Sequence, residues 1–503
     1  MKKFENFIFT VCLIIMVSIV VVMRPLSNLD EVWNFNIARC ISSGLVPYKD
    51  ISMVSTPLLG FIVAIPLKLF GHELFYARIC SIIFGLISFI LIFKILKNLG
   101  IKREISNLVI LLVLAIIINY IALDYNFLAL ILVLSIILSE IKAIRLQSWK
   151  LFGADVLIGI LAGLVICCKQ SIGLIISIIA VLNPLFYISK KKHVKECTKI
   201  IGKRILGVCI PVLVFVTYLC ANNAFYNFID YSVKGIKTFS NMLPYSSLVM
   251  SGNLFVRILS IIVPLVMVIC FIVCIVGKIR KRDKNMLYIL TLYSLGMFTV
   301  SFPISDYAHF VFAIVPSIIL FVYGLKLLLL LFKKVSENDF KYTLAFINIF
   351  SILLILTGTL WIELMNNDNL SKISKYDYQK HFRYIYVSDE VSKSIKLIDE
   401  FSKTKEQNVY ILDAMSPIYM IPMDRYNKNY DMFRIGNFGS GGEDSIIECI
   451  KNEDALYLIV KDDKKLNWQN PSKVRAYMLE NMELVESVGI FDVYRNTAYE
   501  DGV

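Results

Sequence analysis

Long apolar runs, separated by short polar connections, repeat through the first three quarters of the chain. A helix needs about 20 mostly apolar residues to cross a bilayer, because its backbone rises about 1.5 Å per residue. The runs that approach this length predict membrane-spanning helices at residues 7–25, 74–96, 105–122, 125–141, 151–168, 172–189, 205–221, 253–277, 286–302, 310–331 and 342–363. Because these spans are odd in number, the two ends of the chain should lie on opposite sides of the membrane.

The connection between the first two predicted spans, residues 26–73, is too long for a simple turn. Apolar residues recur on one side of a helix over 30–43, and a second apolar stretch covers 56–70 with a proline inside it. Both segments are typical of interfacial helices, which bury one face at the membrane surface.

The pattern changes after about residue 365, where short apolar runs alternate with amphipathic stretches. Strands are predicted at 408–413, 456–460 and 491–494, and helices at 390–403, 443–451 and 472–481. The predicted fold is therefore a polytopic α-helical membrane domain of about eleven spans, residues 1–365, followed by a small α/β domain, residues 366–503.

Composition agrees with this division. Hydrophobic residues make up 57% of the chain and charged residues 18%, and the mean hydropathy is +0.69, which excludes a purely soluble protein. The net charge of +13 would suit a nucleic-acid binder, but the basic residues gather in short clusters between apolar runs, as in membrane proteins. We therefore expect no nucleic-acid partner. Most of the 11 cysteines lie inside apolar segments and are predicted to be buried thiols.

The basic clusters occur at every second connection, for example at 97–103, 142–150 and 190–204. Cytoplasmic loops are rich in Lys and Arg, so the alternate, acidic connections and the C-terminal domain should face outward. The first apolar run lacks a small-residue cleavage site and is predicted to be a retained span with a cytoplasmic N-terminus. The pattern favours a bacterial plasma membrane.

Two adjacent carboxylates, Asp30 and Glu31, follow the first span directly and begin the predicted helix over 30–43. At a helix N-terminus a carboxylate can simply stabilise the helix. An ionised Asp at the membrane surface can also act as a general base toward an incoming hydroxyl. Composition and spacing leave both interpretations open.

The wider stretch adds Gly44-Leu45-Val46-Pro47-Tyr48-Lys49-Asp50, Thr56-Pro57-Leu58, Phe70-Gly71 and Ala77-Arg78. With Asp30-Glu31, these motifs resemble the first outer loop of the GT-C membrane glycosyltransferases, a superfamily that includes protein O-mannosyltransferases and the lipid A aminoarabinose transferase. The resemblance implies that Asp30 is the catalytic base and that Glu31 positions the acceptor or a metal. Tyr48 and Asp50 become candidates for substrate or metal contacts.

Three further residues stand at outer ends of spans. Asp124 lies in a very short turn, where it is either a hydrated turn residue or, as the resemblance implies, a second acid facing the catalytic cavity. Lys169 is either a lysine that extends to the membrane surface or a group that neutralises a donor phosphate. Arg78 is either an interfacial anchor or a bidentate phosphate ligand.

Asp306 and His309, spaced i, i+3 at the start of the tenth span, would share one helix face. This spacing permits metal binding, but one His and one carboxylate are too few for a site, so a capped helix start is preferred. A divalent cation such as Mg²⁺ or Mn²⁺ would do the same electrostatic work as the basic residues, which leaves the metal requirement open.

These residues together predict an outward cavity in which a sugar moves from a polyprenyl-phosphate donor to an acceptor hydroxyl, with inversion. The acceptor would be a glycan, a lipid or a protein, and the C-terminal domain would shape the acceptor site or recruit a partner. The alternative is a transporter or flippase of lipid-linked sugars or polysaccharide. It should place ionisable residues near the mid-plane of the spans and show internal repeats.

The orientation gives a direct test. A tag placed at Lys281 should be inaccessible to a membrane-impermeant reagent applied to intact cells, because this residue falls in a predicted cytoplasmic loop. A tag in the C-terminal domain should be accessible. Labelling of the tag at Lys281 in intact cells would overturn the predicted orientation.

Overall fold

The computed structural model describes residues 2–26, 28–146, 152–187, 194–238, 242–276, 281–332, 380–427, 429–430, 433–461, 469 and 471–496. Its contacts divide the chain into two compact units. The first comprises Met1–Val21, Ser81–Phe215 and Leu243–Asn367. The second comprises Val22–Cys80, Val216–Met242 and Asp368–Val503, so two segments distant in sequence pack with the C-terminal domain.

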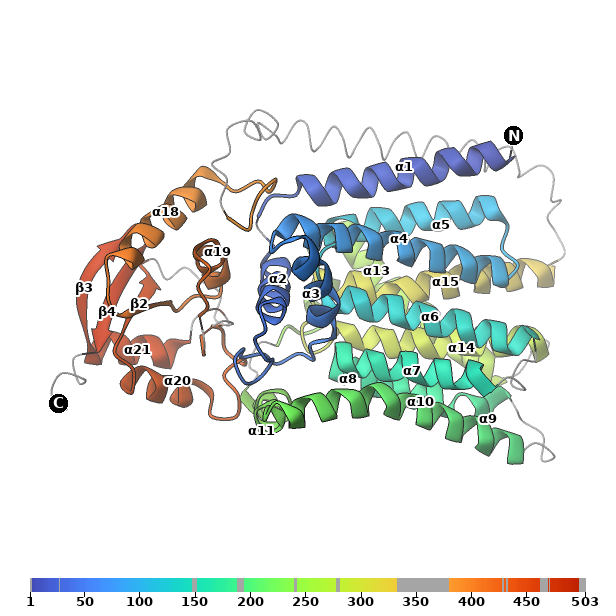
Figure 1. Ribbon diagram of the computed structural model, residues 1–503. Helices are drawn as coiled ribbons and strands as arrows, with labels where there is room; N and C mark the ends of the chain where they lie inside the picture. The colour runs from blue at the N-terminus through green and yellow to red at the C-terminus, as the bar shows by residue number, and fades with distance from the viewer. Residues whose placement is uncertain are drawn as a thin grey trace. The chain divides into compact units, whose positions relative to one another are not determined.

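The first unit is a bundle of apolar helices that run side by side (Figure 1). Six helices in the described part of the chain are long and apolar enough to cross a membrane, and several shorter apolar helices accompany them. The principal helices are α1 (Lys2–Met23), α4 (Leu74–Asn98), α5 (Arg103–Ile117), α6 (Tyr125–Leu146), α7 (Phe152–Cys168), α8 (Gln170–Leu182), α10 (Val194–Ala221), α13 (Leu254–Val276), α14 (Lys281–Phe298) and α15 (Tyr307–Phe332).

Each predicted span up to 310–331 coincides with one of these helices, whereas the span predicted at 342–363 lies outside the described residues. The connections form short helices. These are η1 (Ile118–Tyr120), α9 (Pro184–Tyr187), α11 (Phe225–Phe228), η4 (Ile229–Val233), η5 (Lys234–Thr238), α12 (Ser246–Val249) and η6 (Thr299–Ser301).

Glycines allow α7 and α10 to approach each other closely. A Cβ atom at Gly163 would lie 2.5 Å from the carbonyl oxygen of Val208, and one at Gly207 would lie 2.8 Å from the Cα of Gly159. Small residues spaced four apart bring helix backbones together in membranes, where apolar burial alone gives little drive for association.

A buried ion network joins the same helices. Arg204 donates through Nη1 and Nη2 to Glu140 at 2.6 and 3.0 Å, and through Nε to Asp155 at 3.1 Å. Tyr293 donates to the same Glu140 at 3.2 Å, and the Arg204 and Glu140 side chains are fully buried. The sequence analysis placed Arg204 at the end of a basic connection, 190–204. The structure corrects this, because α10 begins at Val194 and Arg204 is a fully buried residue within it.

We predict that Arg204→Met lowers the free energy of unfolding by about 3–5 kcal/mol, because it leaves two buried carboxylates without their cation. The measurement is the thermal unfolding midpoint in detergent. Lys199→Met, an exposed site on the same helix, is the control and should have little effect. Equal midpoints for the two variants would contradict the prediction.

The second unit begins with α2 (Leu29–Ser42) and α3 (Leu58–Phe70), which coincide with the two predicted outer-loop helices. The one-sided burial expected for α2 is wrong: every residue from Glu31 to Cys40 is buried. One side packs on α3, where a Cβ atom on Gly60 would lie 2.9 Å from the side chains of Ile37 and Ile41. Residues of the C-terminal domain contact other parts of α2, so the helix is enclosed.

The C-terminal domain is built on a four-stranded sheet in the order β1-β2-β4-β3, in which β1 and β2 are parallel and the other pairs antiparallel (Figure 1). The strands are β1 (Asn408–Ile411), β2 (Ala455–Val460), β3 (Met482–Val488) and β4 (Phe491–Asn496). The helices are α18 (Asp389–Lys403), α19 (Ser416–Met420), η7 (Ile421–Met423), α20 (Gly442–Lys451) and α21 (Ser472–Asn481).

The strand β2 explains why this sheet forms a core. Its residues 455–459 are all buried, which is the pattern of a strand covered on both faces. Tyr457 and Ile459 belong to a hydrophobic cluster that includes Ile446 of α20 and Met478 of α21. All predicted strands and helices of the domain coincide with observed ones, but β3 was not predicted. Its middle is exposed and carries two glutamates, so it lacks the apolar signal of a strand.

Candidate functional site

Asp30 lies in the first turn of α2 and is half-buried. It is not the cap of the helix, because Asn28 takes that position and accepts a hydrogen bond from the backbone N–H of Glu31 at 3.1 Å. The backbone oxygen of Asp30 accepts from Asn34 Nδ2 at 2.8 Å. Among the described residues, the carboxylate of Asp30 has no hydrogen-bond or ion-pair partner. It is therefore available to a substrate.

Glu31, unlike Asp30, is fully buried and paired with a cation. Its carboxylate accepts from Arg78 Nε at 3.2 Å and from Arg78 Nη2 at 2.7 Å, and both side chains are fully buried. The remaining N–H groups of Arg78 donate to the backbone oxygens of Val22 at 3.2 Å, Arg24 at 2.5 Å and Pro25 at 3.5 Å. All five guanidinium donors are thus used.

This geometry separates the roles of two neighbouring acids. Arg78, at the start of α4, fixes both the chain that leaves α1 and the first turn of α2. Glu31 is held in a buried ion pair, whereas the carboxylate of Asp30, in the same first turn, has no ion-pair partner among the described residues. In this arrangement Arg78 holds Glu31 and backbone carbonyls, not an exogenous anion.

Tyr48 and Asp50 stabilise the turn that follows α2. Tyr48 is buried at φ +68°, a conformation that bulky residues rarely adopt, and its hydroxyl donates to the backbone oxygen of Ser55 at 2.7 Å. Asp50 accepts from the backbone N–H of Val46 at 2.9 Å. Both side chains therefore have local structural partners.

In the first unit, Asp124 stands at the start of α6 and accepts from the backbone N–H of Asn126 at 2.5 Å. Lys169 lies where α7 ends and α8 begins. Its ammonium donates to Asn126 Oδ1 at 2.7 Å and lies 5.2 Å from the ring centre of Tyr125. Asp124 and Lys169 thus contact the same residue, Asn126, at the start of α6.

Asp306 and His309 interact as their spacing predicted. Asp306 Oδ1 accepts from the backbone N–H of His309 at 2.8 Å and lies 2.7 Å from its Nδ1, so Asp306 caps the start of α15. Burial raises the pKa of the Asp306 carboxyl, but the hydrogen bonds and charge of His309 outweigh it, so the pKa is lowered. The charge of Lys169 acts in the same direction.

No three His, Cys, Asp or Glu side chains gather closely enough to hold a metal ion in the part of the chain that the structure describes. The structure thus pairs Glu31 with Arg78, Asp306 with His309, and Lys169 with the turn that follows Asp124. The expectation that all predicted site residues share one pocket stays a prediction.

Comparisons with known proteins bear on this arrangement. A family model described as dolichyl-phosphate-mannose-protein mannosyltransferase matches residues 54–221. The crystal structure of apo ArnT from Cupriavidus metallidurans aligns over 99% of both chains, with 13% identity and a TM-score of 0.57. ArnT bound to undecaprenyl phosphate aligns over 98% of both chains, with 12% identity and a TM-score of 0.55. A search of curated proteins gives no match.

The chain therefore shares its fold with ArnT over nearly its whole length. This agrees with the resemblance predicted from the outer-loop motifs, and the apolar helices support a multi-pass membrane protein. The matched segment 54–221 contains Arg78, Asp124 and Lys169, whereas Asp30 and Glu31 precede it. The shared fold supports the architecture, and the roles of individual residues rest on their geometry.

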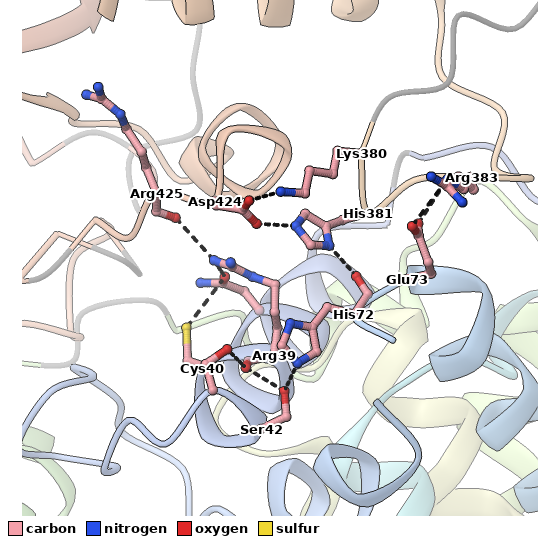
Figure 2. A network of polar contacts seen from close by, with 12 residues as sticks. Arg39, Cys40, Ser42, His72, Glu73, Lys380, His381, Arg383, Asp424 and Arg425 are labelled. Atoms are coloured by element: carbon pink, nitrogen blue, oxygen red, sulfur yellow. Dashed lines mark hydrogen bonds and ion pairs between the residues drawn. The ribbon is translucent and has the colours of Figure 1, made fainter. Parts of the chain in front are cut away.

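A polar cluster in the second unit was not predicted from the sequence. His381 lies between the backbone oxygen of His72 and the carboxylate of Asp424, and Lys380 binds the same carboxylate (Figure 2). The chain has four histidines, and this cluster contains two of them. The small number of histidines was the one feature of the sequence that could have drawn attention to this cluster. Its contacts are not visible in the sequence, because more than 300 residues separate His72 from His381.

We predict that Arg78→Lys lowers the free energy of unfolding by about 3 kcal/mol, since a lysine offers three donors where five acceptors are buried. Thermal unfolding in detergent measures the effect. Arg383→Lys is the control, because the Arg383 side chain is 60% exposed. A midpoint for Arg78→Lys equal to that of the control would contradict the role assigned to the buried pair.

Proposed function

We propose that this protein is a glycosyltransferase that moves a sugar from a polyprenyl-phosphate donor to an acceptor hydroxyl on the extracytoplasmic face of a bacterial plasma membrane. The observation that carries the proposal is the half-buried carboxylate of Asp30, which has no hydrogen-bond or ion-pair partner in the part of the chain that the structure describes. Asp30 follows the first membrane helix directly, in a chain that shares its fold with ArnT.

Asp30 serves as the general base. A general base must be within reach of the hydroxyl whose proton it accepts, and Asp30 is half-buried in the first turn of α2. The buried pair of Glu31 and Arg78 keeps that first turn in place. In this proposal Glu31 and Arg78 position the base. The sequence analysis suggested instead that Glu31 positions the acceptor or a metal and that Arg78 binds the donor phosphate.

The reaction is a single displacement. The acceptor hydroxyl gives its proton to the carboxylate of Asp30 while its oxygen forms a bond to the anomeric carbon of the donor. The bond between that carbon and the phosphate oxygen breaks, and polyprenyl phosphate leaves with the electron pair. Attack opposite the leaving group inverts the anomeric configuration.

The leaving phosphate needs a positive partner as charge develops on it. We assign this role to Lys169, whose ammonium is held at the α7–α8 junction by Asn126. Asp124 fixes the same turn by capping α6, so it supports Lys169. The related ArnT structure that contains undecaprenyl phosphate supports a lipid phosphate as the carrier. The acceptor class remains a hydroxyl of a glycan, a lipid or a protein.

The transporter alternative is less well supported. It would need ionisable residues along a path through the spans. Within the described bundle, Glu140, Asp155 and Arg204 are such residues, but they are buried and paired with one another. This is the arrangement of a structural ion network.

The decisive experiment supplies purified protein in nanodiscs with polyprenyl-phosphate sugars and hydroxyl acceptors. Asp30→Asn should lower the transfer rate by about 10²–10⁴-fold, the usual contribution of a general base, without lowering the unfolding midpoint. Asp389→Asn, an exposed first-turn aspartate of α18, is the matched control and should transfer at the wild-type rate.

Transfer by Asp30→Asn at the wild-type rate would remove Asp30 from the mechanism. Movement of intact donor across the bilayer without glycosidic cleavage would favour the transporter alternative. A product that retains the anomeric configuration of the donor would contradict single displacement.

A further inference from the structure

The helix that carries Asp30 is held by the C-terminal domain near its beginning. Trp33, one turn after Asp30, donates from its indole Nε1 to the backbone oxygen of Ala414 at 2.9 Å. The guanidinium of Arg434 lies 4.4 Å from the centre of the Trp33 ring, at cation–π distance. Trp33 is 3% exposed. Its orientation therefore depends on the loop after β1 and on Arg434.

The last turn of α2 is held by a second group of contacts. Arg39 Nη2 donates to Asn36 Oδ1 at 3.0 Å and to the backbone oxygen of Arg425 at 3.1 Å. Ser42 Oγ lies 2.9 Å from His72 Nε2 (Figure 2). A rigid helix fixed at both ends has a fixed axis and rotation, so these contacts also define where Asp30 points.

The segment that follows Lys380 completes this attachment. His381 Nδ1 lies 2.5 Å from the backbone oxygen of His72, and His381 Nε2 binds the carboxylate of Asp424 (Figure 2). Further along, the backbone oxygen of Tyr386 accepts from the N–H of Leu26, just before α2. One segment of the C-terminal domain thus contacts the chain on both sides of α2.

The carboxylate of Asp424 is held between two partners, Lys380 and His381. Burial raises the pKa of Asp424, but the hydrogen bonds of Lys380 and His381 outweigh it and hold the pKa below its usual value. The ionised carboxylate is therefore favoured at this position.

The backbone here is held in a rare conformation. His381 has φ +70° and Asp424 has φ +54°, in the left-handed region that residues other than glycine seldom adopt. Such conformations persist where the surrounding contacts over-determine them, often at functional sites. We call the pair of His381 and Asp424, with their contacts to His72 and Lys380, the clasp.

We propose that the C-terminal domain is a positioning device for the catalytic helix, in which Trp33, Arg39 and the clasp hold α2 so that Asp30 points toward the acceptor. This proposal rests on the proposed function of Asp30. Trp33, Arg39, His381 and Asp424 are positioning residues, because they act through the helix and not on the substrate.

The test measures kcat and the donor KM for wild type, His381→Gln and Asp424→Asn. We expect kcat to fall about 10–100-fold with the donor KM changed less than about twofold, since a small misplacement of a catalytic group has effects of this size. Asp424→Glu, which keeps the carboxylate, should recover part of kcat.

The control is Asp444→Asn, which breaks an exposed ion pair with Lys473 in the same domain and should leave kcat unchanged. Wild-type kcat in both His381→Gln and Asp424→Asn would overturn the proposal. If Asp30→Asn also transfers at the wild-type rate, the proposed function itself fails. If Asp30→Asn loses transfer while the clasp variants keep the wild-type kcat, the positioning role is rejected and the proposed function stands.

Hydrogen exchange provides a second measurement that does not require activity. In His381→Gln, amide exchange in α2, residues 29–42, should become faster, while exchange in β2 and β4 stays at the wild-type rate. Faster exchange across the whole domain would indicate unfolding and contradict a positioning role. Unchanged exchange in α2 would likewise contradict it.

Discussion

The constraint on which the outer region depends is the buried pair of Arg78 and Glu31. A fully buried guanidinium is costly unless every donor finds an acceptor. Here two donors bind Glu31 and three bind the backbone that leads out of the first membrane helix. This one side chain therefore joins the end of α1, the start of α2 and the start of α4. It sets where the outer loop begins.

The pair also explains how two neighbouring carboxylates acquire different roles. Successive residues on a helix point about 100° apart, so Asp30 and Glu31 lie in different environments although they are adjacent in sequence. Glu31 is paired with Arg78, whereas Asp30 has no ion-pair partner among the described residues. The residue proposed as the base therefore stands beside an acid whose charge is already balanced.

Much of the fold could be predicted from the sequence because it depends on local pattern. Apolar runs located the spans, and short apolar segments located β1, β2 and β4. What the sequence did not reveal depends on contacts between distant residues. Arg204 looked like a loop cation, but its partners Glu140 and Asp155 belong to other helices. The enclosure of α2 required the loop after β1, nearly 400 residues away.

In the candidate site, too, local sequence patterns were predictable and contacts between distant residues were not. The motifs drew attention to Asp30, Glu31 and Arg78, but residue types alone could not decide which acid is free and which is paired. Asp306 and His309 were recognisable because their contact is local, at i, i+3. The clasp was not recognisable, since neither His72 nor His381 lies in a motif and their separation hides the contact.

The central claim is that Asp30 removes the acceptor proton, and the most direct test replaces the acceptor with a nucleophile that has no proton to lose. Azide is such an anion, and it should restore donor cleavage in Asp30→Asn, giving a glycosyl azide of inverted configuration. Rescue of cleavage in the variant, with no gain in wild type, is the predicted result. Failure of azide to restore cleavage, while the variant remains folded and binds the donor, would contradict the account.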